Sequence, residues 1–227
     1  MNKFKDDLFE TVNHLIRLSP SSLNLFLECP RCFWLYLNRK IERPRIPVAT
    51  ITTGLDRVVK EYFDIYRTKN ILPPILKGKV PGKLISNLPK KGWLEYLDTK
   101  VNAKLGGYLD ECLDLGSSFY AALDHKTRGS APSQIHSSYQ LQMDAYTFLL
   151  EQNKFSTKRI AYIVYYFPNK INENNNFIFE VSVKEIKTNP ERVKKVFYEA
   201  INIIRGPIPK INESCNFCKW ISTKDIQ

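Results

Sequence analysis

The sequence predicts an α/β protein in which helices flank a small mixed sheet. Residues 105–127 match a β-hairpin, because two apolar strand patterns surround a Gly-Ser-Ser turn at 116–118. A helical pattern follows at 138–153, with apolar residues spaced for one helix face. Residues 160–167 are apolar on both alternating faces, as expected of an interior strand. We therefore expect a sheet built around the hairpin, with helices packed beside it.

The part of the chain before the hairpin is predicted to be mainly helical. Ser19 and Pro20 form a typical helix start, because Ser caps the first turn and Pro fits its first position. Pro30 should kink or restart this helix. Leu, Val, Tyr and Phe at helical spacing predict a further helix over 52–67. Residues 70–89 are rich in Pro and Gly and are expected to be irregular.

The part after the interior strand is predicted to add one strand and one helix. Residues 172–176 match a turn, and 177–183 match a second strand. Asn189 and Pro190 cap a last helix that should run through Ile204. These elements complete the predicted α/β core.

The composition is that of a globular protein with an excess of basic residues. Of 227 residues, 43% are hydrophobic and 25% are charged, so the chain can bury a substantial core, and we expect a single domain over 1–227. No apolar run approaches the roughly 20 residues of a membrane span. Charged residues interrupt the N-terminal segment, unlike a secretory signal, so we expect a cytoplasmic protein. The formal net charge of +11 points toward a polyanionic partner such as DNA.

Two aspartates and a lysine are predicted to lie together on the hairpin. Asp124 and Lys126 should point to one face, because side chains alternate along a strand. If the turn is centred on Ser117, Asp110 lies directly opposite Asp124. Two carboxylates this close repel each other unless a cation lies between them, and oxygen ligands favour Mg²⁺ or Mn²⁺. The sequence therefore predicts a divalent-metal site with Asp110 and Asp124 as ligands.

Such a site has the parts that phosphodiester hydrolysis needs. A bound ion can polarise a phosphate and lower the pKa of a bound water. Lys126 adds positive charge where the transition state gathers negative charge, and Arg128 in the following loop is a candidate phosphate contact. The alternative is that both aspartates are surface residues and that Lys126 is only their ion-pair partner, since short motifs often occur by chance.

The order of these residues resembles a known family. Asp110, then Asp124-x-Lys126, then Gln142-x-x-x-Tyr146 on the next helix resembles the RecB-like branch of the PD-(D/E)XK nucleases. The resemblance implies a restriction-endonuclease-like core with its catalytic part in residues 105–167. It also implies that Gln142 and Tyr146, which share one helix face, support catalysis by holding DNA or water. A buried aromatic beside a polar residue is the alternative account of this pair.

One position departs from the family pattern. Helicase-linked relatives often place a metal-binding His on an early helix, shortly after a Gly. Here Gly54 is followed by Asp56 at the corresponding position, and an aspartate can bind the same ion. The resemblance thus implies Asp56 as a third metal ligand. A surface ion pair between Asp56 and Lys60 is an equally good account, and Glu61 is a weaker alternative ligand.

Four of the five cysteines form two C-x-x-C pairs at opposite ends of the chain. They are Cys29 with Cys32, and Cys215 with Cys218. In a cytosolic chain this pattern favours a metal site over disulfides. Four thiolates suit tetrahedral Zn²⁺ or a 4Fe–4S cluster, and the spacing does not separate the two.

A metal at these cysteines would join residues 19–40 and 207–220 into one lobe and contribute folding energy. We expect a 4Fe–4S cluster, with zinc or a metal-free set of buried thiols as alternatives. Cluster-bearing RecB-like relatives usually have one cysteine before the nuclease core and three after it, so the two-plus-two pattern departs from theirs. Cys112 and the three histidines show no ligand spacing.

Together these features predict a divalent-metal-dependent DNA nuclease. The main alternative is a non-catalytic nucleic-acid-binding protein with the same fold and a structural Cys₄ zinc site. A more distant alternative is a redox protein, although neither C-x-x-C pair lies in a thioredoxin-like βαβ pattern. The sequence leaves open exonuclease or endonuclease action, strand preference, protein partners and oligomeric state.

Overall fold

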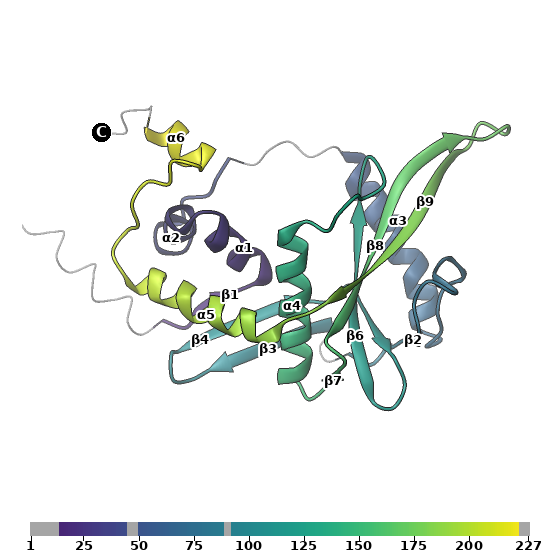
Figure 1. Ribbon diagram of the computed structural model, residues 1–227, viewed down its shortest axis with the longest axis horizontal. Coiled ribbons are helices and arrows are strands. Elements are labelled where there is room, and N and C mark those ends of the chain that lie inside the picture. Colours follow the sequence, from purple (N-terminus) through teal and green to yellow (C-terminus); the bar gives the residue numbers. More distant parts are fainter. Residues whose placement is uncertain (1–13, 45–49, 89–91, 223–227) are drawn as a thin grey trace, which may run out of the picture. The chain divides into compact units, whose positions relative to one another are not determined.

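The computed structural model describes residues 14–44, 50–88 and 92–222 (Figure 1). These segments contain mixed sheets together with helices, so the predicted α/β class is confirmed. The chain divides into two compact units. The first combines the described parts of Met1–Ile46, Glu95–Gly106 and Glu191–Gln227, and the second combines those of Pro47–Leu94 and Gly107–Pro190. The first unit therefore brings together both ends of the chain.

The first unit begins with two helices in immediate succession. Helix α1 spans Pro20–Glu28, and the Ser19 and Ser22 side chains each bond the other's backbone N–H in a capping box. Helix α2 spans Pro30–Arg39, with Cys29 as its N-cap. Proline at the first helical position is tolerated because an N–H there has no partner within the helix. The predicted restart at Pro30 is thus confirmed.

A three-stranded sheet and two further helices complete the first unit. The sheet order is β1 (Ile16–Leu18), β4 (Ala103–Tyr108), β3 (Trp93–Asp98), and β1 runs parallel to β4. The predicted last helix is present as α5 (Pro190–Arg205), and a short α6 spans Asn216–Ser222. The Tyr198 hydroxyl of α5 donates to the Asp98 carboxylate of β3, and this bond lowers the pKa of Asp98 despite its burial.

The second unit is built on a mixed sheet with the order β2-β5-β6-β8-β9. Its strands are β2 (Lys83–Leu84), β5 (Glu111–Asp114), β6 (Phe119–Thr127), β8 (Ile160–Ile171) and β9 (Phe177–Lys187), and β7 (Ser156–Thr157) pairs with β6. Strands β6 and β8 are parallel and are connected through helix α4 (Ser137–Gln152). The β5/β6 and β8/β9 pairs are antiparallel.

The predicted first hairpin strand over 105–115 is wrong, because the chain forms two strands there. It leaves β4 after Tyr108 and enters β5 at Glu111, and β4 belongs to the sheet with β1. The N–H of Leu109 donates to the carbonyl of Gly92 at 3.0 Å, so the ladder does not continue into β5. The hairpin is therefore β5/β6, with positive φ at Gly116, Ser117 and Ser118 in its turn.

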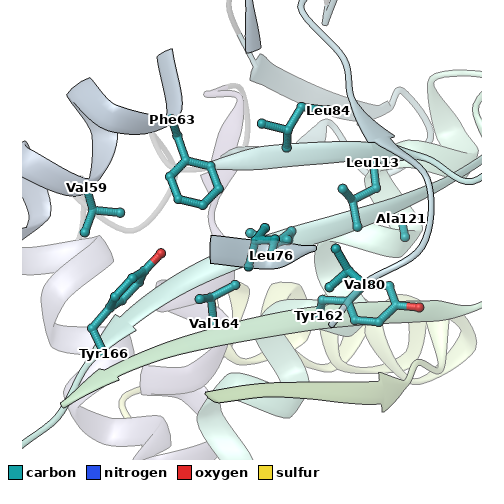
Figure 2. Close-up of a cluster of buried hydrophobic side chains, with 11 residues drawn as sticks. Val59, Phe63, Leu76, Val80, Leu84, Leu113, Ala121, Tyr162, Val164 and Tyr166 are labelled. Atoms are coloured by element: carbon teal, nitrogen blue, oxygen red, sulfur yellow. The ribbon is translucent and has the colours of Figure 1, made fainter. Parts of the chain in front are cut away.

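Helix α3 (Thr50–Arg67) packs its apolar side on the second unit's sheet. Figure 2 shows Phe63 of α3 beside Leu76, which a single 3₁₀ turn brings into the same cluster. Strand β8 is buried on both faces over 161–167, as predicted for an interior strand. The predicted helices at 52–67 and 138–153 are both confirmed, as α3 and α4. Among the described residues, no helix is long and apolar enough to cross a membrane.

Candidate active site and cysteine cluster

Asp110 and Asp124 lie where the hairpin register places them opposite each other. The ladder of β5 and β6 pairs Glu111 with Leu123 and Asp114 with Tyr120, so its continuation aligns Asp110 with Asp124. Asp110 directly precedes β5, and its Oδ2 accepts a hydrogen bond from the backbone N–H of His125 at 3.3 Å. The register is therefore the one expected from the sequence, although Asp110 lies just outside the strand.

Asp124 is a buried carboxylate, and its surroundings shift its pKa in opposite directions. Its side chain is 2% exposed. Burial, with a smaller contribution from Asp110, raises its pKa to about 6 against the opposing effect of the nearby Lys126 ammonium. Lys126 Nζ forms an ion pair with Asp124 Oδ2 and lies 5.0 Å from the ring centre of Tyr139. Asp124 and Lys126 thus share one face of β6.

Gln142 and Tyr146 of α4 reach this same carboxylate. Gln142 Nε2 donates to Asp124 Oδ1 at 3.1 Å and to the Tyr146 hydroxyl at 2.9 Å. Tyr146 is buried, and burial together with the Asp124 charge raises its pKa. The structure therefore brings together four of the residues singled out in the sequence: Asp124, Lys126, Gln142 and Tyr146.

Asp56 is connected to this cluster through Lys60, a residue that the sequence reasoning did not assign to the site. Asp56 Oδ2 lies 2.9 Å from Lys60 Nζ, which is 4.0 Å from Asp110 Oδ1. The bond to Asp56 is the main reason why the pKa of Lys60 is raised. Glu61 pairs with Arg57 on the exposed side of α3. In the described ranges, no three carboxylate or histidine side chains approach closely enough to share an ion.

On the opposite side of β5 and β6 from the candidate site lies a buried polar network that the sequence did not predict. The Glu111 side chain is 1% exposed, and Arg67 Nε of α3 donates to its Oε2 at 2.8 Å. His125 Nε2 lies 3.9 Å from Glu111 Oε1, and His125 Nδ1 lies 3.1 Å from the Tyr166 hydroxyl. Glu111 follows Asp110 and His125 follows Asp124, so this network supports both strands of the proposed site. The signal available in the sequence was an acidic residue, Glu111, beside Cys112 and Leu113 in a strand that is buried.

The four paired cysteines form a buried cluster in the first unit. Their Sγ atoms all lie within 4.8 Å of one another, so the predicted cysteine cluster between the two chain ends is confirmed. The Sγ–Sγ distances are 3.6 Å for Cys29 and Cys218, 3.6 Å for Cys32 and Cys215, and 3.8 Å for Cys32 and Cys218. All five cysteines are free, and Cys112 is buried in β5. This cluster is the chain's clearest set of metal ligands.

Arg43 supplies positive charge beside this cluster. Its Nη2 donates to Cys215 Sγ at 3.4 Å, and its Nη1 pairs with Glu28. Burial raises the pKa of the Cys32 and Cys218 thiols. Burial acts the same way on Cys215, but backbone N–H bonds from Cys218 and Phe217 and the neighbouring thiols lower its pKa to about 7. Of Cys32, Cys215 and Cys218, Cys215 is therefore the thiol that ionises most readily.

Comparison with known proteins identifies the family. A carboxylate pair, a lysine on the same strand face and a helix carrying Gln and Tyr describe a nuclease-type site on an α/β core. The chain belongs to the PD-(D/E)XK nuclease superfamily, whose model matches residues 85–223. A solved structure described as "Crystal structure of SSO0001" is similar over 98% of this chain and 93% of that chain, at 14% identity and a TM-score of 0.49. No curated protein matches the chain.

Proposed function

We propose that this protein is a divalent-metal-dependent DNA nuclease of the RecB-like kind that hydrolyses phosphodiester bonds. The observation that carries the proposal is the environment of Asp124. This carboxylate is buried next to Asp110, is bonded by Gln142 and is paired with Lys126. Membership of a nuclease superfamily and the net charge of +11 support a nucleic-acid substrate.

The residues fit a hard divalent cation. Asp124 Oδ2 is buried without a well-oriented hydrogen bond among the described residues, and its ion pair with Lys126 only partly offsets its charge. Carboxylate oxygens are the ligands that Mg²⁺ and Mn²⁺ prefer. Asp110 and Asp124 would hold the ion, and Asp56 would join them when its pair with Lys60 opens. When bound, the ion polarises the phosphodiester and lowers the pKa of a water molecule.

The protein side chains have distinct roles in this proposal. Lys126 places an ammonium beside the reacting phosphate, where negative charge accumulates. Gln142 fixes the orientation of Asp124 through Oδ1 and is itself held by Tyr146. Arg128, whose N–H bonds the carbonyl of Tyr166, lies directly after β6 and would contact a neighbouring phosphate.

One observation favours the alternative of a non-catalytic nucleic-acid-binding protein. Lys126 pairs with Asp124, and Lys60 lies between Asp56 and Asp110. Two lysines therefore offset most of the charge of three carboxylates without a metal ion. A protein of this kind would bind DNA through its basic surface and leave it intact.

Cleavage of labelled DNA separates the two functions. Single- and double-stranded substrates would be incubated with the protein and Mg²⁺, Mn²⁺ or a chelator, beside the Lys126→Gln variant. The nuclease proposal requires cleavage that depends on the divalent ion and that falls at least about 100-fold in the variant. DNA binding without cleavage under every condition would support the alternative.

A further inference from the structure

We propose that the four cysteines bind one tetrahedrally coordinated metal ion instead of a 4Fe–4S cluster. The four thiolate ligands favour zinc as this ion, and Arg43 stabilises the centre. The inference is independent of the nuclease proposal, because every residue that carries it lies in the first unit. It rests on three observations: the size of the sulfur group, the backbone around each C-x-x-C pair, and the arginine at the edge of the cluster.

The sulfur atoms have the spacing of a single-ion site. A zinc–thiolate bond is about 2.3 Å long, and a tetrahedron's edge is about 1.6 times its centre-to-corner distance, so the sulfurs of a Cys₄ site lie about 3.8 Å apart. Three of the six Sγ–Sγ distances here are 3.6, 3.6 and 3.8 Å, and the other three do not exceed 4.8 Å. The group therefore matches one ion surrounded by four thiolates.

A cubane cluster needs a larger group. Each cysteine of a 4Fe–4S cluster binds a different iron at a different corner, so its sulfurs lie roughly 6 Å apart. Here all four Sγ atoms lie within 4.8 Å of one another. The observed group of sulfurs is therefore smaller than a four-iron cluster requires and has the size expected for one ion.

Both C-x-x-C turns have the backbone of a metal-binding knuckle. Cys29 and Cys215 each stand immediately before a helix, α2 and α6. The N–H of Cys32 bonds Cys29 Sγ at 3.5 Å. Two pairs with two residues between their members are the usual spacing of structural zinc sites. Such N–H groups stabilise thiolates, which are the form that binds metal.

Arg43 offsets charge that four thiolates leave on a divalent ion. A Zn²⁺ ion with four thiolates carries two net negative charges, and Arg43 Nη2 lies 3.4 Å from Cys215 Sγ. The arginine is 25% exposed and is held in place by Glu28. Hydrogen-bonded partners of metal ligands typically raise metal affinity about 10- to 100-fold, so we expect Arg43 to raise the zinc affinity by a factor of about this size.

Metal analysis tests the identity of the centre. The full-length protein would be prepared without oxygen from cells supplied with both iron and zinc, and its metal and sulfide content measured. We expect one zinc per chain, and X-ray absorption with a shell of sulfur neighbours at about 2.3 Å. Iron and acid-labile sulfide in equal amounts, or a protein without metal at these cysteines, would overturn the proposal.

The role of Arg43 is tested by zinc transfer to a coloured chelator. Arg43→Gln should lower zinc affinity about 10- to 100-fold, Arg43→Lys should restore part of it, and the exposed Arg39→Gln on α2 serves as the charge-matched control. Equal zinc affinity in the Arg43→Gln and Arg39→Gln variants would show that Arg43 does not stabilise the centre. Neither measurement depends on DNA cleavage, so the outcome is separate from that of the proposed nuclease.

Discussion

At the scale of single residues, Asp124 combines burial with an incomplete set of partners. Burial raises its pKa to about 6, against an ordinary value of 3.8. Folding therefore favours its protonated form, while Lys126 favours its ionised form. Above pH 6 the ionised carboxylate lowers the stability of the metal-free protein, and a divalent ion would relieve this cost.

Asp124→Asn should therefore have opposite effects on activity and stability. A group with a raised folded pKa contributes stability that is fully present below about pH 4 and lost as the pH rises through about 6. Urea unfolding in chelator at pH 8 should show the variant to be about 1–2 kcal/mol more stable, while divalent-dependent cleavage is abolished. Glu173→Gln, in an exposed turn, should change neither property. A variant no more stable than the wild type at pH 8, or a gain that is equally large at pH 4, would contradict this account.

The ion pair between Asp56 and Lys60 bears on whether Asp56 is the third ligand of the proposed metal site. Lys60 competes with a metal ion for Asp56 and Asp110. If Asp56 is a ligand, Asp56→Asn should raise the Mg²⁺ concentration for half-maximal cleavage about tenfold, and Lys60→Gln should lower it. A titration of cleavage against Mg²⁺ measures both, with Arg57→Gln on the same helix as the control. Unchanged half-maximal concentrations would leave Asp56 as a surface partner of Lys60.

At the scale of helices and strands, the Arg67–Glu111 pair ties α3 to the strand that follows Asp110. Two of the three Arg67 guanidinium nitrogens contact the Glu111 carboxylate, which is 1% exposed, and the third pairs with Asp64. Removing one partner leaves a buried charge uncompensated, which is costly. The position of α3, and of Asp56 and Lys60 on it, depends on this pair.

Glu111→Gln should therefore destabilise the protein by about 2 kcal/mol, since Arg67 is partly exposed and keeps some contact with water. Chemical denaturation measures the change. Replacing both partners by apolar residues, as in Arg67→Met with Glu111→Leu, should recover part of the loss. Arg57→Gln removes an exposed ion pair on the same helix and should have little effect. Equal losses in the Glu111→Gln and Arg57→Gln variants would show that the buried pair has no special role.

The helices and the central strands could be predicted because their signals are local. Ser19 caps its helix and Pro30 starts the next one through contacts within a few residues. The split between β4 and β5 could not be predicted, because it follows from the pairing of β4 with β1, more than 80 residues earlier. The register of Asp110 and Asp124 followed from the turn, whereas Lys60 and Arg67 reach Asp110 and Glu111 from α3, a helix distant in the sequence.

At the scale of the whole molecule, the cysteine cluster connects the two chain ends. Cys29 and Cys32 come from the start of the first unit and Cys215 and Cys218 from its end, with most of the sequence between them. Among the described residues, Leu25 and Phe217 are the partly buried hydrophobic side chains that pack against the cluster, and α6 is short. A metal ion would therefore act as the main cross-link, and its binding energy would contribute directly to folding.

Loss of this cross-link should lower thermal stability without unfolding all of the protein. Cys215→Ser, or treatment with a strong chelator, should lower the Tm by about 5–10 °C, as expected for a loss of a few kcal/mol in a chain of this size. Cys112→Ser is the matched control, because Cys112 is equally buried but lies in β5, outside the cluster. Calorimetry with and without chelator measures both variants. A chelator-sensitive Tm in Cys112→Ser together with an unchanged Tm in Cys215→Ser would place the stabilising metal away from the cysteines.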